Sequence, residues 1–520
     1  MTRRASNAIL VVILLACTVA VYFPVRQFQF VNWDDADMVV ANPLLHPPTS
    51  DHLGQIWARP HLGLYTPLSY TLWWCAARAS GDGSNPATFH ILNLLLHAAA
   101  AALAFSIILR FVDSAWPALA GAMIFSLHPM QVESVAWIAQ MNNLLAGALS
   151  LAAIRLYFLF SDSKGRRRGF CYAAATLAFV LALFAKPTAV IVPLIVIILD
   201  LGMARRPIGA VVRSSWPWII LAIVFSIVAR AAQTVHGGPL WQVPFIALDS
   251  LGFYFREIFW PAHLTLDDAR TPPRVWDSGQ WIMNGLAIVV LAALIWPTGR
   301  RSRQPAVAAA IAIAALLPVL GLVPFTQQIF STTADRYVYL AMLGPALFIA
   351  WLLTRVPQTW AIILALIFIC PLIWLTSRQL ATWQNTDALA DHILQLDTAS
   401  TIGNKIKAAE LTRTGHPDQA IGYYQAAMIR NPADPDLHFN LANALVATGD
   451  YASAINEYQS IRNCSTDLQL RGMNNLGVAY AKSGQADLAQ WEFNQVLQID
   501  PQNREASRNL QILARGVPSR

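Results

Sequence analysis

An acidic group in a largely apolar chain has the residue types and spacing for proton transfer. Asp34, Asp35 and Asp37 stand in the stretch FVNWDDAD. Two adjacent carboxylates beside a region of low dielectric constant repel each other, so we expect the pKa of one of them to be raised. A carboxylate of this kind can take a proton from an incoming hydroxyl. The alternative interpretation is an ordinary solvated turn.

A second group of polar residues stands in the stretch HPMQVE, which holds His128, Pro129 and Glu133. A proline ends or kinks a helix and leaves backbone groups free, which in a membrane is tolerated where the backbone lines a cavity. We therefore expect His128 at the mouth of a cavity and Glu133 one helical turn and a residue further on. The alternative is an ordinary helix end with an exposed glutamate.

The third group is basic and consists of Lys186, Arg256 and Arg336. The distribution of basic residues described below places all three on the outer side of a membrane, where positive charge is unusual. Such charges need a partner, and a lipid phosphate is the natural one. The alternative is that Arg336 pairs with its neighbour Asp335 or with lipid headgroups in general.

Together the three groups suit transfer from a lipid donor that carries a phosphate. The acidic pair would activate a hydroxyl acceptor, and the cations would stabilise the leaving phosphate as negative charge develops on it. A membrane would hold the donor next to the base. These cations can serve the leaving group, so we expect no required metal; a divalent ion at Asp34 and Asp35 is the alternative.

Two other kinds of chemistry are disfavoured by spacing. His90, Asn93 and His97 recur at helical spacing, but no carboxylate or cysteine stands at ligand spacing beside them, which favours hydrogen-bonded helix packing over a metal site. The chain has no phosphate loop, no GxSxG and no dinucleotide-binding glycine run, so nucleotide hydrolysis has no visible machinery.

The elements that must position these residues are membrane helices. The chain has 520 residues, of which 56% are apolar and 12% charged, whereas soluble domains carry about 25% charged residues. This composition excludes a soluble globular enzyme, a disordered tail and a disulfide scaffold. Residues 1–380 have a net charge of +10 and residues 381–520 of −3. The basic residues stand mostly at the ends of apolar runs, as membrane topology requires, so we expect no nucleic-acid partner.

Eleven apolar runs are long enough, or nearly so, to be spans of an all-α membrane bundle. With the N-terminus inside, the basic residues of the short loops fall inside as well, and the odd number of spans places the C-terminal part outside. The aromatic segment 245–260 is then an interfacial or re-entrant helix on the outer side. The runs are 7–25, 87–111, 115–128, 142–161, 169–186, 187–204, 214–232, 281–297, 305–325, 338–354 and 358–378.

The C-terminal part repeats with a period near 34 residues. Small residues recur at Ala420, Ala454 and Ala489, each followed four positions later by an aromatic residue: Tyr424, Tyr458 and Phe493. This is the tetratricopeptide (TPR) pattern, in which small residues let two helices touch and an aromatic side chain fills the gap. The expected organisation is a membrane domain at 1–380, a linker helix at 381–400 and three TPRs at 401–515, which would bind a peptide or protein.

An ordered series of motifs resembles one family. FVNWDDAD, YTPLSY, FHILNLLLHA, FSLHPMQVESVAW, LFAKPTAVIVPL and ADRYVYL, followed by TPRs, are similar to the transmembrane-and-TPR protein O-mannosyltransferases and their bacterial relatives, which are glycosyltransferases of superfamily C (GT-C). The resemblance implies a GT-C type bundle and inverting transfer of a sugar from a polyprenyl-phosphate donor to an acceptor on the outer face. In eukaryotic members the donor is dolichyl-phosphate mannose and the acceptor is Ser or Thr.

The resemblance also implies roles for particular residues. Asp34 and Asp35 correspond to the catalytic acidic pair. The remaining matches imply donor phosphate and sugar binding by His128, Glu133, Lys186, Arg336 and Tyr337. Two stretches depart from the family pattern: Thr66 stands where an arginine precedes proline, and Met141, Asn142 and Asn143 stand where an arginine and an aspartate follow ESVAW.

We therefore predict a multi-pass protein of a bacterial inner membrane with a periplasmic TPR domain. Its partners would be an undecaprenyl-phosphate sugar, a protein or glycan acceptor and a peptide or protein bound to the TPRs. Two alternatives remain open: a non-catalytic membrane anchor that displays TPRs for envelope assembly, and a flippase for lipid-linked sugars. A flippase would need polar groups through the full depth of the membrane, whereas here they gather at one face.

Overall fold

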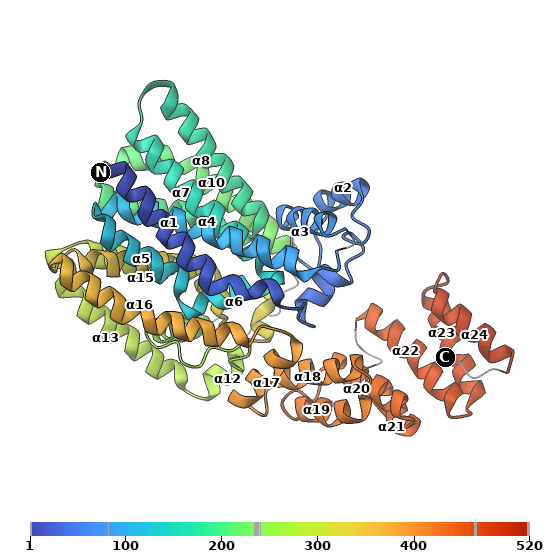
Figure 1. Ribbon diagram of the computed structural model, residues 1–520. Coiled ribbons are helices and arrows are strands. Elements are labelled where there is room, and N and C mark those ends of the chain that lie inside the picture. The colour runs from blue at the N-terminus through green and yellow to red at the C-terminus, as the bar shows by residue number, and fades with distance from the viewer. Residues whose placement is uncertain (1–2, 82, 233–238, 240, 462–464, 517–520) are drawn as a thin grey trace. The chain divides into compact units, whose positions relative to one another are not determined.

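The computed structural model describes residues 3–516 except 82, 233–238, 240 and 462–464. The chain divides into two compact units, Met1–Asn385 and Thr386–Arg520. Both are helical, and the only β-structure among the described residues is an isolated bridge between His61 and Leu64. The predicted all-α class, with a bundle of apolar helices followed by helical repeats, is confirmed (Figure 1).

The first unit contains long apolar helices joined by short helical turns. Its elements are α1 (Arg3–Tyr22), η1 (Phe23–Gln27), η2 (Ala36–Val40), α2 (Ser50–Ala58), α3 (Pro67–Ala79), α4 (Pro86–Val112), α5 (Ala115–Leu127), η3 (Pro129–Gln131), α6 (Val132–Ala136), η4 (Ile138–Gln140), α7 (Met141–Asp162), α8 (Gly165–Ala185), η5 (Pro187–Ile191), α9 (Val192–Leu199), η6 (Asp200–Ala204), α10 (Ile208–Ala231), α11 (Val243–Phe259), α12 (Pro272–Asp277), α13 (Gln280–Arg301), α14 (Gln304–Leu316), η7 (Leu317–Val319), η8 (Thr326–Ile329), η9 (Asp335–Val338), α15 (Leu343–Leu353) and α16 (Gln358–Ala381).

Each of the eleven predicted apolar runs coincides with a helix. In the searched part of the chain, seven helices are long and apolar enough to cross a membrane, and four shorter apolar helices match the remaining runs. Helices are the expected form because lipid offers no hydrogen-bond partners to the backbone. The chain is therefore a multi-pass membrane protein, and the count of eleven spans stays a prediction. The aromatic segment 245–260 is the helix α11, which packs on α13.

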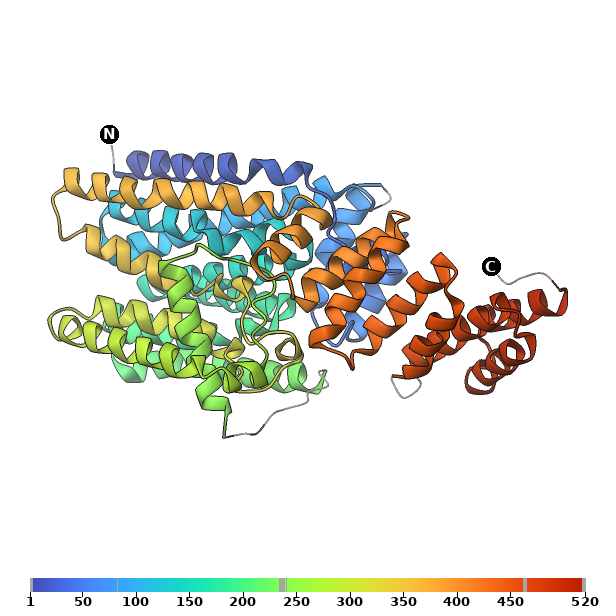
Figure 2. The ribbon, with the colours of Figure 1, turned by 90° about the horizontal axis from the view of Figure 1, so that it is seen from below.

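Small residues allow close contact inside the bundle. A side chain at Gly121 in α5 would collide with the backbone of Ala346 in α15, and one at Gly344 would collide with the backbone of Ala308 in α14. Membrane helices associate through such small residues because lipid supplies no hydrophobic driving force between them. At one side of the bundle α1 and α16 run next to each other (Figure 2).

The loop between α1 and α4 is ordered by its own apolar core. Ile56, Tyr70 and Trp73 are buried in it together with Phe89 of α4 and Ile138 of η4. The hydrophobic effect therefore holds this polar loop against the start of α4 and the turn before α7. The acidic stretch at residues 34–37 lies in the same loop, so its position is fixed by packing.

The second unit is an array of antiparallel helix pairs. Its helices are α17 (Thr386–Leu396), α18 (Thr401–Arg413), α19 (Pro417–Arg430), α20 (Pro435–Thr448), α21 (Tyr451–Ser460), α22 (Thr466–Lys482), α23 (Ala486–Ile499) and α24 (Arg504–Ala514). The three small residues and three aromatic residues of the predicted repeat all lie in one buried core. The TPR prediction is thereby confirmed.

Removal of the aromatic ring from the third repeat should destabilise this unit. Phe493 is fully buried, and its ring lies against Gly477, where an added Cβ would come within 2.6 Å of it. We expect Phe493→Ala to lower the free energy of unfolding by about 3–5 kcal/mol through lost burial and a residual cavity. Hydrogen exchange of the α22 and α23 amides in the full chain would measure this. Leu488→Ala, on an exposed position of the same helix, should have little effect; equal effects would contradict the prediction.

Candidate active site

A buried ion pair forms the centre of the candidate site. Helix α5 ends at Leu127, and Pro129 starts the short turns that carry Glu133 in α6. Glu133 pairs with the guanidinium of Arg336 in η9, and the Arg336 backbone N–H donates to Glu133 Oε2 at 3.2 Å. Both side chains are buried. Because a buried charge needs a partner, this pair fixes η9 against α6. The predicted alternative, in which Arg336 pairs with Asp335, is wrong.

Aromatic rings enclose the same guanidinium. The Cζ atom of Arg336 lies 5.4 Å from the ring centroid of Trp137 and 5.1 Å from that of Tyr337. Contacts of this kind are favourable because the face of an aromatic ring is electron-rich. Burial alone would lower the pKa of Arg336, but the negative charge of Glu133 opposes this effect, and the pKa of Arg336 lies above its ordinary value. Arg336 thus keeps its charge in a buried environment.

Asn143 connects the second cation to this centre. The Lys186 ammonium donates to Asn143 Oδ1 at 3.2 Å, while Asn143 Nδ2 donates to the Arg336 carbonyl at 2.6 Å and to Ser134 Oγ at 2.9 Å. Lys186 lies between α8 and η5 and has an extended backbone conformation, as expected for a residue that precedes proline. Asn143 is not among the predicted site residues, and its only signal in the sequence is that this position departs from the family pattern.

The two adjacent acids differ in their surroundings. Asp35 is 1% exposed and accepts hydrogen bonds from the backbone N–H groups of Val31 at 3.0 Å and Ala139 at 2.8 Å. Burial raises the pKa of Asp35 to about 7, and these two hydrogen bonds oppose the shift. Its oxygens are engaged by the backbone, so Asp35 positions the loop. A direct catalytic role for Asp35 stays a prediction.

Asp34 is close enough to both cations for its charge to interact with theirs. Its side chain is half-buried, and its charge interacts with Arg336 and Lys186. Burial raises the pKa of Asp34 above its ordinary value, the two cations oppose this shift, and Asp37 and Glu133 reinforce it. A raised pKa was expected from repulsion between neighbouring acids, but burial is the larger cause. The structure therefore places Asp34, Glu133, Lys186 and Arg336 together.

A narrow cavity lies beside this group. Its lining mixes polar side chains with small residues, including Asn143, Ser150, Thr188, Tyr337 and Ala189. The cavity volume is about 30 Å³. That is roughly the share of one water molecule in the liquid, so a sugar phosphate would require the lining to move apart.

His128 does not belong to this group. Its side chain is 2% exposed, its Nε2 lies 3.0 Å from the Ile258 carbonyl, and its Nδ1 accepts from the Met130 N–H at 3.3 Å. Both ring nitrogens are occupied by the backbone, which corrects the predicted contact with substrate. His97 likewise contacts the Tyr339 hydroxyl at 3.0 Å and the Ser126 carbonyl at 2.9 Å, so it supports helix packing.

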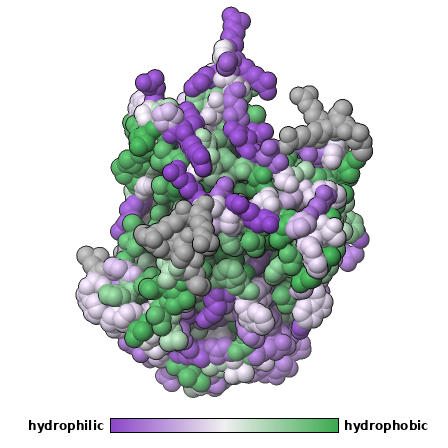
Figure 3. Space-filling view, turned by 90° about the vertical axis from the view of Figure 1, so that its left-hand side faces the viewer, coloured by the Kyte–Doolittle hydropathy of each residue, from purple (hydrophilic) through white to green (hydrophobic). Residues whose placement is uncertain are grey.

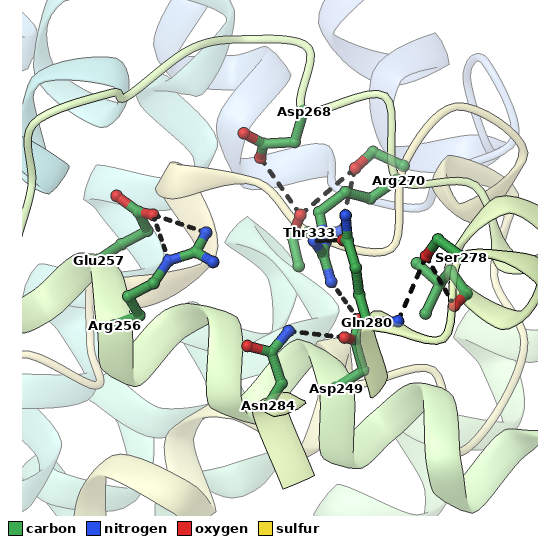
Figure 4. A network of polar contacts seen from close by, with 11 residues as sticks. Asp249, Arg256, Glu257, Asp268, Arg270, Ser278, Gln280, Asn284 and Thr333 are labelled. Carbon is green, nitrogen blue, oxygen red and sulfur yellow. Dashed lines mark hydrogen bonds and ion pairs between the residues drawn. The ribbon is translucent and has the colours of Figure 1, made fainter. Parts of the chain in front are cut away.

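Arg256 lies in a second polar network. Its guanidinium pairs with Glu257 at 3.0 Å (Figure 4). The same network contains the buried pair of Arg270 with Asp249, to which Asn284 Nδ2 donates at 2.7 Å. Arg256 thus has a different carboxylate partner from Arg336, which pairs with Glu133. A contact of Arg256 with substrate stays a prediction.

The described residues contain no group of three or more His, Cys, Asp or Glu side chains that could hold a metal ion. The absence of a required metal stays a prediction.

Comparisons with known proteins give similarities to both parts of the chain. Two tetratricopeptide-repeat family models match residues 411–472 and 470–503. The chain is 28% identical over 123 residues to the protein O-mannosyl-transferase Tmtc2 of Drosophila melanogaster, a match that covers 23% of this chain and 13% of that protein. The matched region thus spans only a small part of this curated relative. The repeat models and the curated match confirm the resemblance that the motifs indicate.

Two solved structures match most of the chain at low similarity. The crystal structure of ArnT from Cupriavidus metallidurans in the apo state is 15% identical, with a TM-score of 0.41, and the match covers 86% of this chain and 79% of that one. The structure of the same protein bound to undecaprenyl phosphate is 14% identical, with a TM-score of 0.37, and the match covers 88% and 81%.

Proposed function

We propose that this relative of the transmembrane-and-TPR O-mannosyltransferases is a membrane glycosyltransferase. It moves a sugar from a polyprenyl-phosphate donor to an acceptor hydroxyl on the extracytoplasmic face. The single observation that carries the proposal is the half-buried carboxyl of Asp34, whose charge interacts with the charges of Lys186 and Arg336. A base and a phosphate-binding pair are the two parts that this reaction needs.

The reaction proceeds as one displacement in this proposal. Asp34 takes the proton of the acceptor hydroxyl while the oxygen of that hydroxyl forms a bond to the anomeric carbon of the sugar. The bond between that carbon and the phosphate oxygen breaks, and polyprenyl phosphate leaves with the electron pair. Lys186 and Arg336 stabilise the negative charge that develops on the phosphate. Attack from the face opposite the leaving group inverts the configuration at the anomeric carbon.

The proposed setting is a bacterial inner membrane with the TPR unit in the periplasm, where the donor is an undecaprenyl-phosphate sugar. The acceptor is a protein or a glycan, and mannose is one candidate sugar. The TPR unit binds a peptide or protein, as helical repeat arrays commonly do.

A reconstituted assay tests the proposal. The purified full chain in nanodiscs receives undecaprenyl-phosphate sugars labelled in the sugar, and release of undecaprenyl phosphate is measured with and without candidate acceptors. Release that depends on Asp34 supports the proposal. A chain that binds no donor but keeps its TPR partners would be a scaffold, and one that moves labelled lipid between leaflets without cleavage would be a flippase.

Donor binding should weaken as the pH rises through neutrality. Burial lowers the pKa of Lys186 to about 7, with a further contribution from Arg336, so the free protein carries the full charge only below this pH. Since the charged form binds phosphate, we expect the KM for the donor to increase above pH 7. In Lys186→Arg this dependence should disappear because arginine stays protonated. An identical pH profile in both proteins would contradict the assignment of Lys186 to phosphate binding.

A further inference from the structure

A second pocket lies between helices far from the candidate active site. It is formed by α1, α5, α15 and α16, and it is lined only by apolar side chains. Leu119, Ala120 and Leu353 are buried at its floor, whereas Trp116 and Leu366 at its rim are 46% and 55% exposed. The pocket is therefore open at the surface of the bundle.

The pocket belongs to one end of the bundle. Trp116 is the second residue of α5, Ala361 is the fourth residue of α16, and Leu353 ends α15. Figure 3 looks onto the end of the bundle where α1 begins, and hydrophilic side chains project from it between apolar ones. The basic residues of the short loops share this end, which the positive-inside rule assigns to the cytoplasmic side.

A hydrocarbon chain fits the volume and the lining. The pocket measures about 160 Å³. An apolar cavity of about 150 Å³ stays dry and accepts a small hydrocarbon, because water would find no hydrogen-bond partners in it. At this depth in a membrane the available hydrocarbon is the chain of a lipid.

A cation lies in the chain two residues after Leu353, which lines the pocket. Arg355 is in the turn 354–357, which joins the two lining helices α15 and α16. Its side chain is exposed, lies 5.0 Å from the ring centroid of Trp351 and pairs with no carboxylate among the described residues. Basic residues at this side of a membrane attract anionic headgroups. Trp116 and Trp360 beside it are exposed, and tryptophan is enriched at the level of the headgroups.

We propose that this pocket is a binding site for an anionic glycerophospholipid. One acyl chain fills the pocket and the phosphate lies on Arg355. The proposal is independent of the proposed sugar transfer, whose phosphate-binding residues stand at the other end of the spans.

Native mass spectrometry of the full chain tests the site. The protein is exchanged into detergent with equal amounts of phosphatidylglycerol and phosphatidylcholine, and retained lipid is counted. We expect one tightly retained phosphatidylglycerol in the unsubstituted protein. In Ala365→Phe the new ring fills the pocket and retention should be lost. Ile367→Phe, on the same helix but outside the pocket, should retain the lipid as the unsubstituted protein does.

The headgroup contact is tested separately. Arg355→Gln should retain phosphatidylglycerol about fivefold less well, with no change for phosphatidylcholine. Equal retention of the two lipids by the unsubstituted protein, or full retention by Ala365→Phe, would overturn the proposal. A second exchange supplies undecaprenyl phosphate together with an equal amount of phosphatidylglycerol. Preferential retention of undecaprenyl phosphate would also overturn the proposal, because the pocket would then hold the donor lipid.

Discussion

Asp34→Asn should reduce sugar transfer by about 10²–10⁴-fold, the usual contribution of a general base. The amide keeps the shape of the side chain but cannot accept the proton of the acceptor hydroxyl. The substitution removes one negative charge from beside Lys186 and Arg336, so donor binding should be equal or tighter. A large loss of kcat with an unchanged or lower KM for the donor is therefore the expected result.

Two neighbouring acids supply matched controls for this variant. Asp37→Asn removes an exposed carboxylate and should leave kcat within a few-fold of the unsubstituted value. Asp35→Asn should lower activity together with stability, because the Asp35 side chain holds the backbone of Val31 and Ala139. If Asp34→Asn kept its turnover while Asp37→Asn lost it, the base would be assigned to the wrong acid.

The pH profile gives an independent check on Asp34. Only the deprotonated carboxylate can act as a base, so the rate should fall as the pH is lowered through the pKa of Asp34. Burial raises that pKa, so this fall should begin at a higher pH than for an ordinary aspartate. In Asp34→Asn the residual rate should lack this acidic limb.

Glu133→Gln should be the most destabilising single substitution in the candidate site. It leaves the Arg336 guanidinium buried without its charged partner, which costs about 3–5 kcal/mol for a buried pair. Chemical unfolding of the full chain in detergent micelles, followed by circular dichroism, would measure this loss.

A double variant separates folding from chemistry. In Glu133→Leu with Arg336→Met, both charges are replaced by apolar side chains, which in buried pairs is often neutral or stabilising. We expect stability to recover toward that of the unsubstituted protein while sugar transfer stays lost, because one phosphate-binding cation is missing. Recovery of transfer in this double variant would show that Arg336 is purely structural.

The architecture was largely predictable from the sequence. Apolar runs of span length leave a helix as the only way to satisfy the backbone in lipid, and the recurring Ala454 and Tyr458 positions fix how the repeat helices pack. The ion pairs and hydrogen bonds inside the candidate site were harder to predict from the sequence. The sequence offers Asp335 as the adjacent partner of Arg336, whereas the fold supplies Glu133 from 203 residues away.

Equivalent residues in a motif can have different tasks once folded. Asp34 and Asp35 are neighbours with the same side chain, and only the positions of the Val31 and Ala139 N–H groups decide that Asp35 is structural. The helix break at Pro129 predicts His128 at the mouth of a cavity. In the structure, the Nε2 atom of His128 instead contacts the carbonyl of Ile258, 130 residues away in the sequence. Long-range backbone contacts of this kind leave no local signal in a sequence.

The hydrogen bond from the Ala139 N–H to Asp35 connects the acidic loop to the segment that contacts the two cations. The short segment 133–143 anchors the acidic loop through Ala139, holds Arg336 through Glu133 and orients Lys186 through Asn143. Displacement of that segment would therefore disengage proton acceptor and phosphate clamp in one motion. Under the proposed mechanism, changes toward another sugar or acceptor would be freest in the other residues that line the cavity, since few changes within these eleven residues would spare both the base and the phosphate-binding cations.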